Sequence, residues 1–423
     1  MREMKDSGIE WIGKIPEEWT KDKAIRLFNI IGSGTTPKNI TSDFPCVNWI
    51  QSGDINGSLI SSCKNNVSES IISQYSALKI YAAPFIVIAM YGASVGNTSI
   101  SLIDGCVNQA CCVLSASIYN LNYAFYAIKS SQNYLIRKAI GGGQPNISQD
   151  TIKQLWLPLP ALHEQKRIAA FLDAECAEID AVLEKTRASI EEYKKLKQAV
   201  ITQAVTKGIR GDRPMKDSGI EWIGDIPAEW DVVRIKNLFD YRNERNFKPL
   251  EEVNLISLYT DKGVVQHCDL DETTGNKASN ADGYKLVYEN DIVVNIILCW
   301  MGAIGRSAYF GVTSPAYDVY SPKQKTNSKF YHYLFRTNGF SGDCYKVGRG
   351  IMAMRWRTYS DQFRAIKVVS PPQSEQEEIV EYLDEKCDGI DDLIAKKQQY
   401  LTEIENYKKS LIYEYVTGKK EVI

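Results

Sequence analysis

The chain has 423 residues, enough for two or three domains that each have a hydrophobic core. Hydrophobic residues make up 44% and charged residues 24% of the sequence, as in globular proteins, and no apolar run is long enough to span a membrane. The net charge of −2 argues at first against a nucleic-acid partner.

The amino terminus and the cysteines indicate a cytoplasmic protein. The first residues, MREMKDSGIEW, lack the apolar stretch of a signal peptide. The ten cysteines are scattered without a Cys-x-x-Cys pair, and the three histidines lie far apart. We therefore expect reduced thiols and no metal site.

One phrase opens the chain and returns later in it. Residues 4–19 read MKDSGIEWIGKIPEEW, and residues 215–230 read MKDSGIEWIGDIPAEW. The span from Gly8 to Lys14 has the spacing of a phosphate-binding loop, but no Ser or Thr follows Lys14, and the second copy has Asp225 there, which would repel phosphate. We interpret the phrase as structural. The predicted core anchors, which would close each domain against a helix, are Trp11, Trp19, Trp222 and Trp230.

The repeat extends along the chain at an offset of 211 residues. Gln165, for example, is matched by Gln376. The blocks between such matches differ, although a Gly-Ala motif follows an apolar, strand-like run in both, at residues 92–96 and 302–305. The order is variable domain, similar helix, variable domain, similar helix. The predicted boundaries are 1–158, 159–210, 211–369 and 370–423.

The basic excess lies in the two variable domains. Residues 20–158 carry 10 Lys and Arg against 6 Asp and Glu, and residues 231–369 carry 19 against 15, so each block has a net charge of +4. The remaining residues then sum to −10. Such an excess fits either a solvated surface or a nucleic-acid partner.

Both helical segments carry an apolar stripe with alternating steps of three and four residues. This spacing is typical of a coiled-coil seam, and we predict that the two copies pair antiparallel within the chain about a pseudo-twofold axis. The alternative is that each helix packs on its own domain or mediates oligomers. The predicted fold class is α+β, with two similar α/β domains separated by two long helices. The predicted seam residues are Leu172, Ile179, Leu183, Ile190, Tyr193 and Val200 in the first helix and Leu383, Ile390, Ile394, Leu401, Ile404 and Leu411 in the second.

No catalytic constellation is evident in the sequence. Gly-x-Ser-x-Gly, His-Glu-x-x-His and paired cysteines are absent. Ser370-Pro371-Pro372-Gln373 lacks both the amide and the aromatic residue of the amino-methyltransferase signature. We expect a binding protein without catalytic residues. Two alternatives stay open: a single-chain nuclease or methyltransferase, and a scaffold whose only function is coiled-coil pairing.

Several motifs together resemble the specificity subunit of type I restriction-modification systems. They are GIEWIG-x-IP-x-EW at 8–19 and 219–230, GGGQPNISQDTIKQLWLPLPALHEQKRIAAFLD at 141–173, WMGAIG at 300–305, SPPQSEQEEIVEYLDEKCDGID at 370–391 and SLIYEYVTGK at 410–419. The resemblance implies two target-recognition domains, each reading one half of a bipartite, asymmetric double-stranded DNA site. It implies helical spacers that dock two modification (methyltransferase) subunits, with restriction subunits joining through the complex. S-adenosylmethionine, ATP and Mg²⁺ would be bound by partner subunits and none by this chain.

Candidate DNA contacts lie in glycine-rich and basic loops of the variable domains. Asn and Gln can read adenine and Arg can read guanine, while Lys and backbone amides hold phosphates. The alternatives are an ordinary turn for the first loop and, for Arg355-Trp356-Arg357, a buried strand with exposed arginine ends. The candidates are Lys38, Gly142, Gly143, Gln144 and Asn146 in the first domain, and Arg242, Asn243, Arg245, Lys346, Arg349, Arg355, Trp356 and Arg357 in the second.

Overall fold

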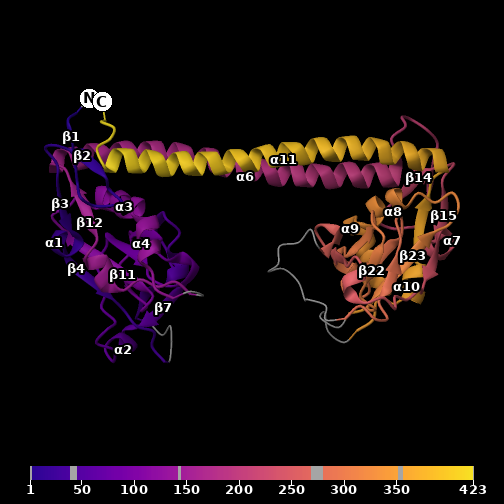
Figure 1. Cartoon of the computed structure of the whole chain (residues 1–423), viewed down its shortest axis with the longest axis horizontal. Coiled ribbons are helices and arrows are strands. Elements are labelled where there is room, and N and C mark those ends of the chain that lie inside the picture. Colours follow the sequence, from indigo (N-terminus) through magenta and orange to yellow (C-terminus); the bar gives the residue numbers. More distant parts are fainter. Residues whose placement is uncertain (1, 39–44, 142–143, 268–279, 351–355, 423) are drawn as a thin grey trace. The chain divides into compact units, whose positions relative to one another are not determined.

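The computed structural model describes residues 2–38, 45–141, 144–267, 280–350 and 356–422. The chain forms two compact units, one made of Met1–Arg187 with Gln399–Ile423 and the other of Ala188–Gln398 (Figure 1). Each unit contains a mixed domain and parts of two long helices, α6 (Leu162–Lys207) and α11 (Gln373–Val416). The predicted α+β fold is confirmed, whereas the four predicted boundaries stay a prediction. In the described ranges, no helix is long and apolar enough to cross a membrane.

The first unit is built around a five-stranded sheet of order β4-β11-β8-β9-β6. β4 and β8 both run antiparallel to β11, so they end at the same edge of the sheet. The buried strand β8 packs on both faces, because Ile86 and Ile88 join one core with α3 while Phe85 and Val87 join another beneath a second, three-stranded sheet. The bounds are β4 (Phe28–Ser33), β11 (Cys111–Ser117), β8 (Phe85–Ala89), β9 (Thr98–Ser101), β6 (Leu59–Ile60) and α3 (Leu121–Ser130), and the second sheet is β10 (Gly105–Val107), β5 (Cys46–Ile50) and β7 (Asn65–Ser68).

The second unit repeats this sheet with the order β16-β23-β20-β21. β16 and β20 run antiparallel to β23 and likewise end at one edge, where β23 begins. One face packs against α8, and the other is covered by the hairpin β17-β18 and the ribbon β19-β22. The bounds are β16 (Phe239–Arg242), β23 (Tyr317–Pro322), β20 (Ile292–Asn295), β21 (Ile304–Arg306), β17 (Ile256–Tyr259), β18 (Gly263–Gln266), β19 (Lys285–Val287), β22 (Gly311–Thr313) and α8 (Ser328–Phe335).

The repeated phrase forms a hairpin in each unit, β1-β2 (Met4–Asp6, Lys14–Pro16) and β13-β14 (Met215–Asp217, Asp225–Pro227). Gly8 and Gly13, which gave the phrase its phosphate-loop spacing, have φ of +67°, a conformation that favours glycine. The Asp6 carboxylate accepts a bond from the Gly8 amide at 2.9 Å, and the same contact recurs in the second copy. The glycines therefore shape a turn, as the structural interpretation predicts.

Two of the four tryptophans close their domains against a long helix. Trp19 and Trp230 are buried, and each indole Nε1 donates at 2.9 Å to a glutamate in the first turn of a long helix, Glu164 and Glu375 respectively. The prediction is confirmed for these two residues. Trp11 and Trp222 differ, because they bond within their domains, to the Trp156 carbonyl at 3.1 Å and the Asp343 carboxylate at 2.6 Å.

α6 and α11 pair antiparallel in each unit. In the first unit, Phe171 contacts Tyr415 with ring centroids 4.4 Å apart, and further along α6 Asp180 pairs with Lys408 at 2.6 Å. In the second, Lys197 pairs with Asp391 at 2.5 Å. Every predicted seam residue is buried or half-buried. The predicted antiparallel coiled coil is therefore confirmed within each unit.

Truncating the seam is expected to destabilise the second unit. Leu383 is fully buried in its core, so Leu383→Ala should lower the free energy of unfolding by about 2–5 kcal/mol. Leu393→Ala is the matched control, because Leu393 lies on the same helix and is 42% exposed. It should change the free energy by less than about 0.5 kcal/mol. Chemical denaturation followed by circular dichroism measures both, and equal effects would contradict the seam assignment.

Candidate nucleic-acid interface

Loops distant in sequence meet at one edge of the main sheet in each unit. In the second unit, β16 and β20 end at this edge, and the amide of Thr358 donates to the Ile296 carbonyl just beyond β20, at 2.9 Å. In the first unit, Ile147 makes the same bond to Met90 beyond β8, also at 2.9 Å. We call this side of each sheet the reading edge.

The two predicted DNA-contacting loops occupy the same structural position. The first is closed by a pair of antiparallel backbone bonds between Ile140 and Asn146, at 2.9 and 3.0 Å. The second is closed in the same way between Arg349 and Arg357, at 2.8 and 2.9 Å. The repeat offset of 211 residues relates Asn146 to Arg357, so the sequence already places these loops at equivalent positions, although the residues inside them do not match. The candidates Gly142, Gly143 and Arg355 lie outside the described residues.

The first loop presents polar side chains from a tight backbone. Gly141 has φ of +107°, and a Cβ there would lie 2.7 Å from the Gln144 carbonyl oxygen, so only glycine fits. Gln144 and Asn146 are exposed, and Asn146 also bridges to Tyr91. Lys38 is exposed on the segment that follows β4 at the reading edge. The structure therefore places the amide pair at the reading edge, while the backbone amide of Lys38 donates to the Tyr75 hydroxyl at 3.2 Å.

The second loop is supported by stacked aromatic rings. Trp356 stacks on Tyr345 with centroids 4.8 Å apart and an interplanar angle of 20°, and its Nε1 donates to the Tyr345 carbonyl at 3.1 Å. Trp300 packs on the same tyrosine. Arg349 and Arg357 are exposed at the base of the loop. Trp356 is thus half-buried and supports the loop through Tyr345. Arg349 and Arg357 are exposed, so a partner surface can reach them.

The other basic candidates bind groups of their own unit. Arg242 pairs with the buried Asp291 at 2.8 Å, and its guanidinium lies 4.4 Å from the Tyr288 ring centroid. Burial raises the pKa of Asp291, and the bonds from the Tyr288 backbone and Arg242 act in the opposite direction. Arg245 donates to the Gly283 carbonyl at 3.0 Å and to the exposed Asn243 at 2.9 Å, and Lys346 pairs with Glu221 at 3.0 Å. Their contact with DNA stays a prediction.

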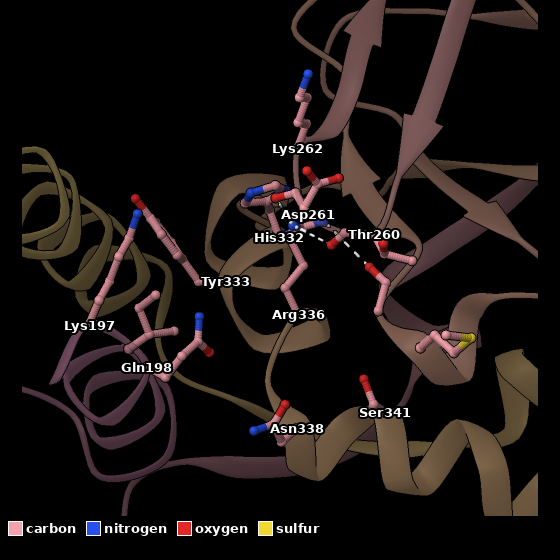
Figure 2. A pocket seen from close by; sticks show the side chains of 13 residues that line it. Lys197, Gln198, Thr260, Asp261, Lys262, His332, Tyr333, Arg336, Asn338 and Ser341 are labelled. Carbon is pink, nitrogen blue, oxygen red and sulfur yellow. Dashed lines mark hydrogen bonds between the residues drawn. The ribbon is translucent and has the colours of Figure 1, made fainter. Parts of the chain in front are cut away.

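A polar cleft of about 470 Å³ lies between α6 and the domain of the second unit (Figure 2). Arg336 donates to the carbonyl oxygens of Thr260 at 2.9 Å and Asp261 at 2.8 Å. His332 Nδ1 accepts the Arg306 amide at 3.1 Å, and burial lowers the pKa of His332 to about 3, so it is neutral. The polar groups that line the cleft therefore mainly hold the turn between β17 and β18 against α8.

The first unit has an equivalent cleft of about 300 Å³. Lys129 donates to the Gly57 carbonyl at 2.7 Å, and burial lowers the pKa of Lys129 to about 8. Tyr126 donates to Asp173 of α6 at 2.8 Å, as Tyr333 does to Asp384 of α11 at 2.7 Å. Both clefts thus lie where a domain packs against a long helix. Among the described residues, no group of three His, Cys, Asp or Glu side chains could hold a metal.

The family model of the type I restriction modification DNA specificity domain matches residues 16–192 and 227–405. The chain is 26% identical over 317 residues to the type I restriction enzyme MjaVIII specificity subunit of Methanocaldococcus jannaschii, covering 71% of this chain and 70% of that one. It is 28% identical over 309 residues to the putative MjaX specificity subunit of the same organism, covering 70% and 65%.

Two solved structures share the fold. A chain from a structure of the assembly and conformational transition of a type I R-M system matches with a TM-score of 0.70 at 14% identity, covering 95% of this chain and 98% of that one. The HsdS subunit from Thermoanaerobacter tengcongensis matches with a TM-score of 0.51 at 15% identity, covering 96% and 98%.

Substitutions of Arg242 and Arg357 should affect stability differently, because Arg242 pairs with a buried carboxylate and Arg357 is exposed. Arg242→Ala leaves the buried Asp291 without its cation and should lower the free energy of unfolding by about 1–3 kcal/mol. Arg357→Ala removes an exposed side chain and should change it by less than about 0.5 kcal/mol. Denaturant titration of both variants measures the difference. A larger loss for Arg357→Ala would contradict the placement.

Proposed function

Because this chain belongs to the type I restriction-modification DNA specificity family and carries its domain twice, we propose that each unit reads one half of a bipartite, asymmetric DNA site. The chain is the specificity subunit of such a system. The observation that carries the proposal is the reading edge. Both units build it from equivalent strands and close its main loop in the same way, but they place different side chains there.

The chemistry of the two loops predicts different base preferences. In the first unit, the exposed amides of Gln144 and Asn146 can each form two hydrogen bonds with adenine in the major groove. In the second, Arg349 and Arg357 can each form two with guanine. Lys38 would hold phosphate and fix the register on the duplex. Two unlike half-sites follow from two unlike loops on one framework.

Modification subunits are proposed to dock on one flank of the paired helices. Next to the seam, exposed apolar side chains recur at equivalent positions of the two copies. Val182 and Tyr407 lie in the first unit, and Leu196 and Leu393 in the second, with exposures from 40% to 56%. The offset of 211 relates Val182 to Leu393 and Leu196 to Tyr407. A surface that occurs twice suits two copies of one partner, whose apolar helix face would cover it.

Catalysis and cofactor binding are proposed to belong to the partner subunits. The relatives above are named specificity subunits, which supports a chain without catalytic residues. S-adenosylmethionine would bind to the modification subunits, and ATP and Mg²⁺ would serve the restriction subunits, in a complex that acts on cytoplasmic DNA. Methylation or cleavage of DNA by the purified chain alone, with S-adenosylmethionine or Mg²⁺ added, would contradict this division.

Substitutions in the two loops should affect different half-sites. Asn146→Ala and Arg357→Ala each remove a proposed base contact from one unit, so each should relax one half of the site by about 1–3 kcal/mol and leave the other half intact. Single-molecule sequencing of DNA methylated by the complete complex measures this for every base position. If both variants relax the same half, or both halves equally, two-headed reading is wrong.

The docking flank can be tested by adding one charge to it. Leu196→Glu places a carboxylate on the proposed interface and should weaken binding of the modification subunit at least about tenfold. Gln198→Glu adds the same charge to another exposed face of α6, because two residues along a helix turn the side chain by about 200°, and should leave binding unchanged. Isothermal titration with the purified modification subunit measures both affinities, with circular dichroism as the check on folding. Equal affinities of the two variants would place the interface elsewhere.

A further inference from the structure

Phe247 is the most exposed large hydrophobic side chain in the described part of the chain, at 82%. A single exposed apolar residue needs no explanation by itself. This one follows β16, on the segment that leaves the sheet at the reading edge of the second unit. Its surroundings therefore decide whether it has a role.

The backbone around Phe247 is fixed by its buried neighbour Asn246. The Asn246 amide donates to the Tyr284 carbonyl at 2.7 Å, and its carbonyl accepts the Gly283 amide at 2.9 Å. The side-chain Nδ2 donates to the carbonyls of Lys248 at 2.8 Å and Ala281 at 2.9 Å, while Oδ1 accepts the Lys248 amide at 3.1 Å. The residues on both sides of Phe247 are thus held, and little backbone freedom would be lost on binding.

An exposed lysine follows Phe247 in the chain. Residues 242–248 read RNERNFK, with three basic residues and one acidic residue. Lys248, the next residue in the chain, is exposed, and Arg245 is held against Gly283 by its bond to that carbonyl. Asp282 is exposed nearby and is the opposing charge on the facing segment. With Asp291, which pairs with Arg242, these charges balance, and Lys248 is the exposed cation that can approach a phosphate.

A turn that presents one aromatic ring from a fixed backbone, next to a lysine, fits a specific feature of the major groove. Thymine is the base that displays a methyl group there, and phenylalanine is among the side chains that contact it. We propose that Phe247 contacts the C5-methyl group of a thymine in the half-site read by the second unit. This inference rests on the proposed function of that unit, and it adds an apolar contact to the polar ones of its main loop.

The chain offers a matched control in Phe310. Phe310 is 60% exposed and packs on Tyr288 with ring centroids 5.1 Å apart. It precedes Gly311, which pairs with Val287 at the far end of β19, whereas Asn246 bonds to Tyr284 at the near end. The two phenylalanines therefore lie at opposite ends of one strand in the same unit.

The test removes the methyl group from the DNA and the ring from the protein. Affinity is measured for the chain in complex with its modification subunits, on duplexes that carry the mapped site. The half-site of the second unit is the half that Arg357→Ala relaxes. Each thymine of that half is replaced in turn by deoxyuridine. At one thymine, wild type should lose about fourfold in affinity, the value of one methyl group. Phe247→Ala should lose at least as much on thymine DNA and lose nothing further with deoxyuridine. Phe310→Ala should behave as wild type.

Other outcomes overturn the contact. If no thymine of that half is sensitive in wild type, or if Phe247→Ala keeps the sensitivity, the proposal is wrong. A loss for Phe247→Ala that is equal on all sequences would indicate stacking or insertion instead, and would also overturn it. If Arg357→Ala relaxes the half-site while Phe247→Ala does not change binding, only this inference fails. If neither half is read in any assay, the proposed function itself fails.

Discussion

A carboxylate in the first turn of each long helix, half-buried at Glu164 and buried at Glu375, holds the recognition domain in place. Glu164 and Glu375 accept the indole N–H of a tryptophan from the repeated phrase, and each also pairs with an arginine, Arg2 or Arg213. A desolvated carboxylate without these partners would cost several kcal/mol, while its place near a helix N-terminus is favourable. The contact fixes how each domain sits on its helix. The sequences of the reading-edge loops can then vary without altering this contact, because no described residue of these loops takes part in it.

The helix pair has a polar contact that sets its register. Lys197 and Lys408 occupy positions of the apolar stripe, yet each reaches an aspartate of the opposite helix, Asp391 and Asp180 respectively. These pairs are related by the offset of 211 residues, so one sequence pattern makes the same bond in both units. Sliding the helices by one heptad in one direction would place Lys408 opposite Arg187. In the other direction the lysines would face Asp173 and Asp384, which already accept bonds from Tyr126 and Tyr333 of their domains. Specific register, more than added stability, is what these charges provide.

Periodicity and repetition were enough to predict the long helices, their antiparallel seam and the structural role of the repeated phrase, because these depend on local spacing. The repeat offset also relates the two reading loops, because Asn146 and Ile147 correspond to Arg357 and Thr358. The offset does not predict the backbone bonds that close each loop, with five residues inside one and seven inside the other. Arg242 is another such case, since its partner Asp291 lies 49 residues away and only the folded sheet brings them together. Phe247 gives no sequence signal, because exposure is a property of the fold.

The first unit is completed by residues translated after the whole of the second. Leu411, Ile412 and Val416 of α11 lie in the same core as Trp11 and the sheet, and the Tyr123 hydroxyl donates to the Val416 carbonyl at 2.8 Å. A nascent chain on the ribosome therefore carries an unfinished amino-terminal core until its last helix emerges. A product of premature termination would lack this closure and expose apolar surface to proteases. Folding of the first unit therefore depends on synthesis of the second, because a truncated chain lacks the α11 residues that complete the first core.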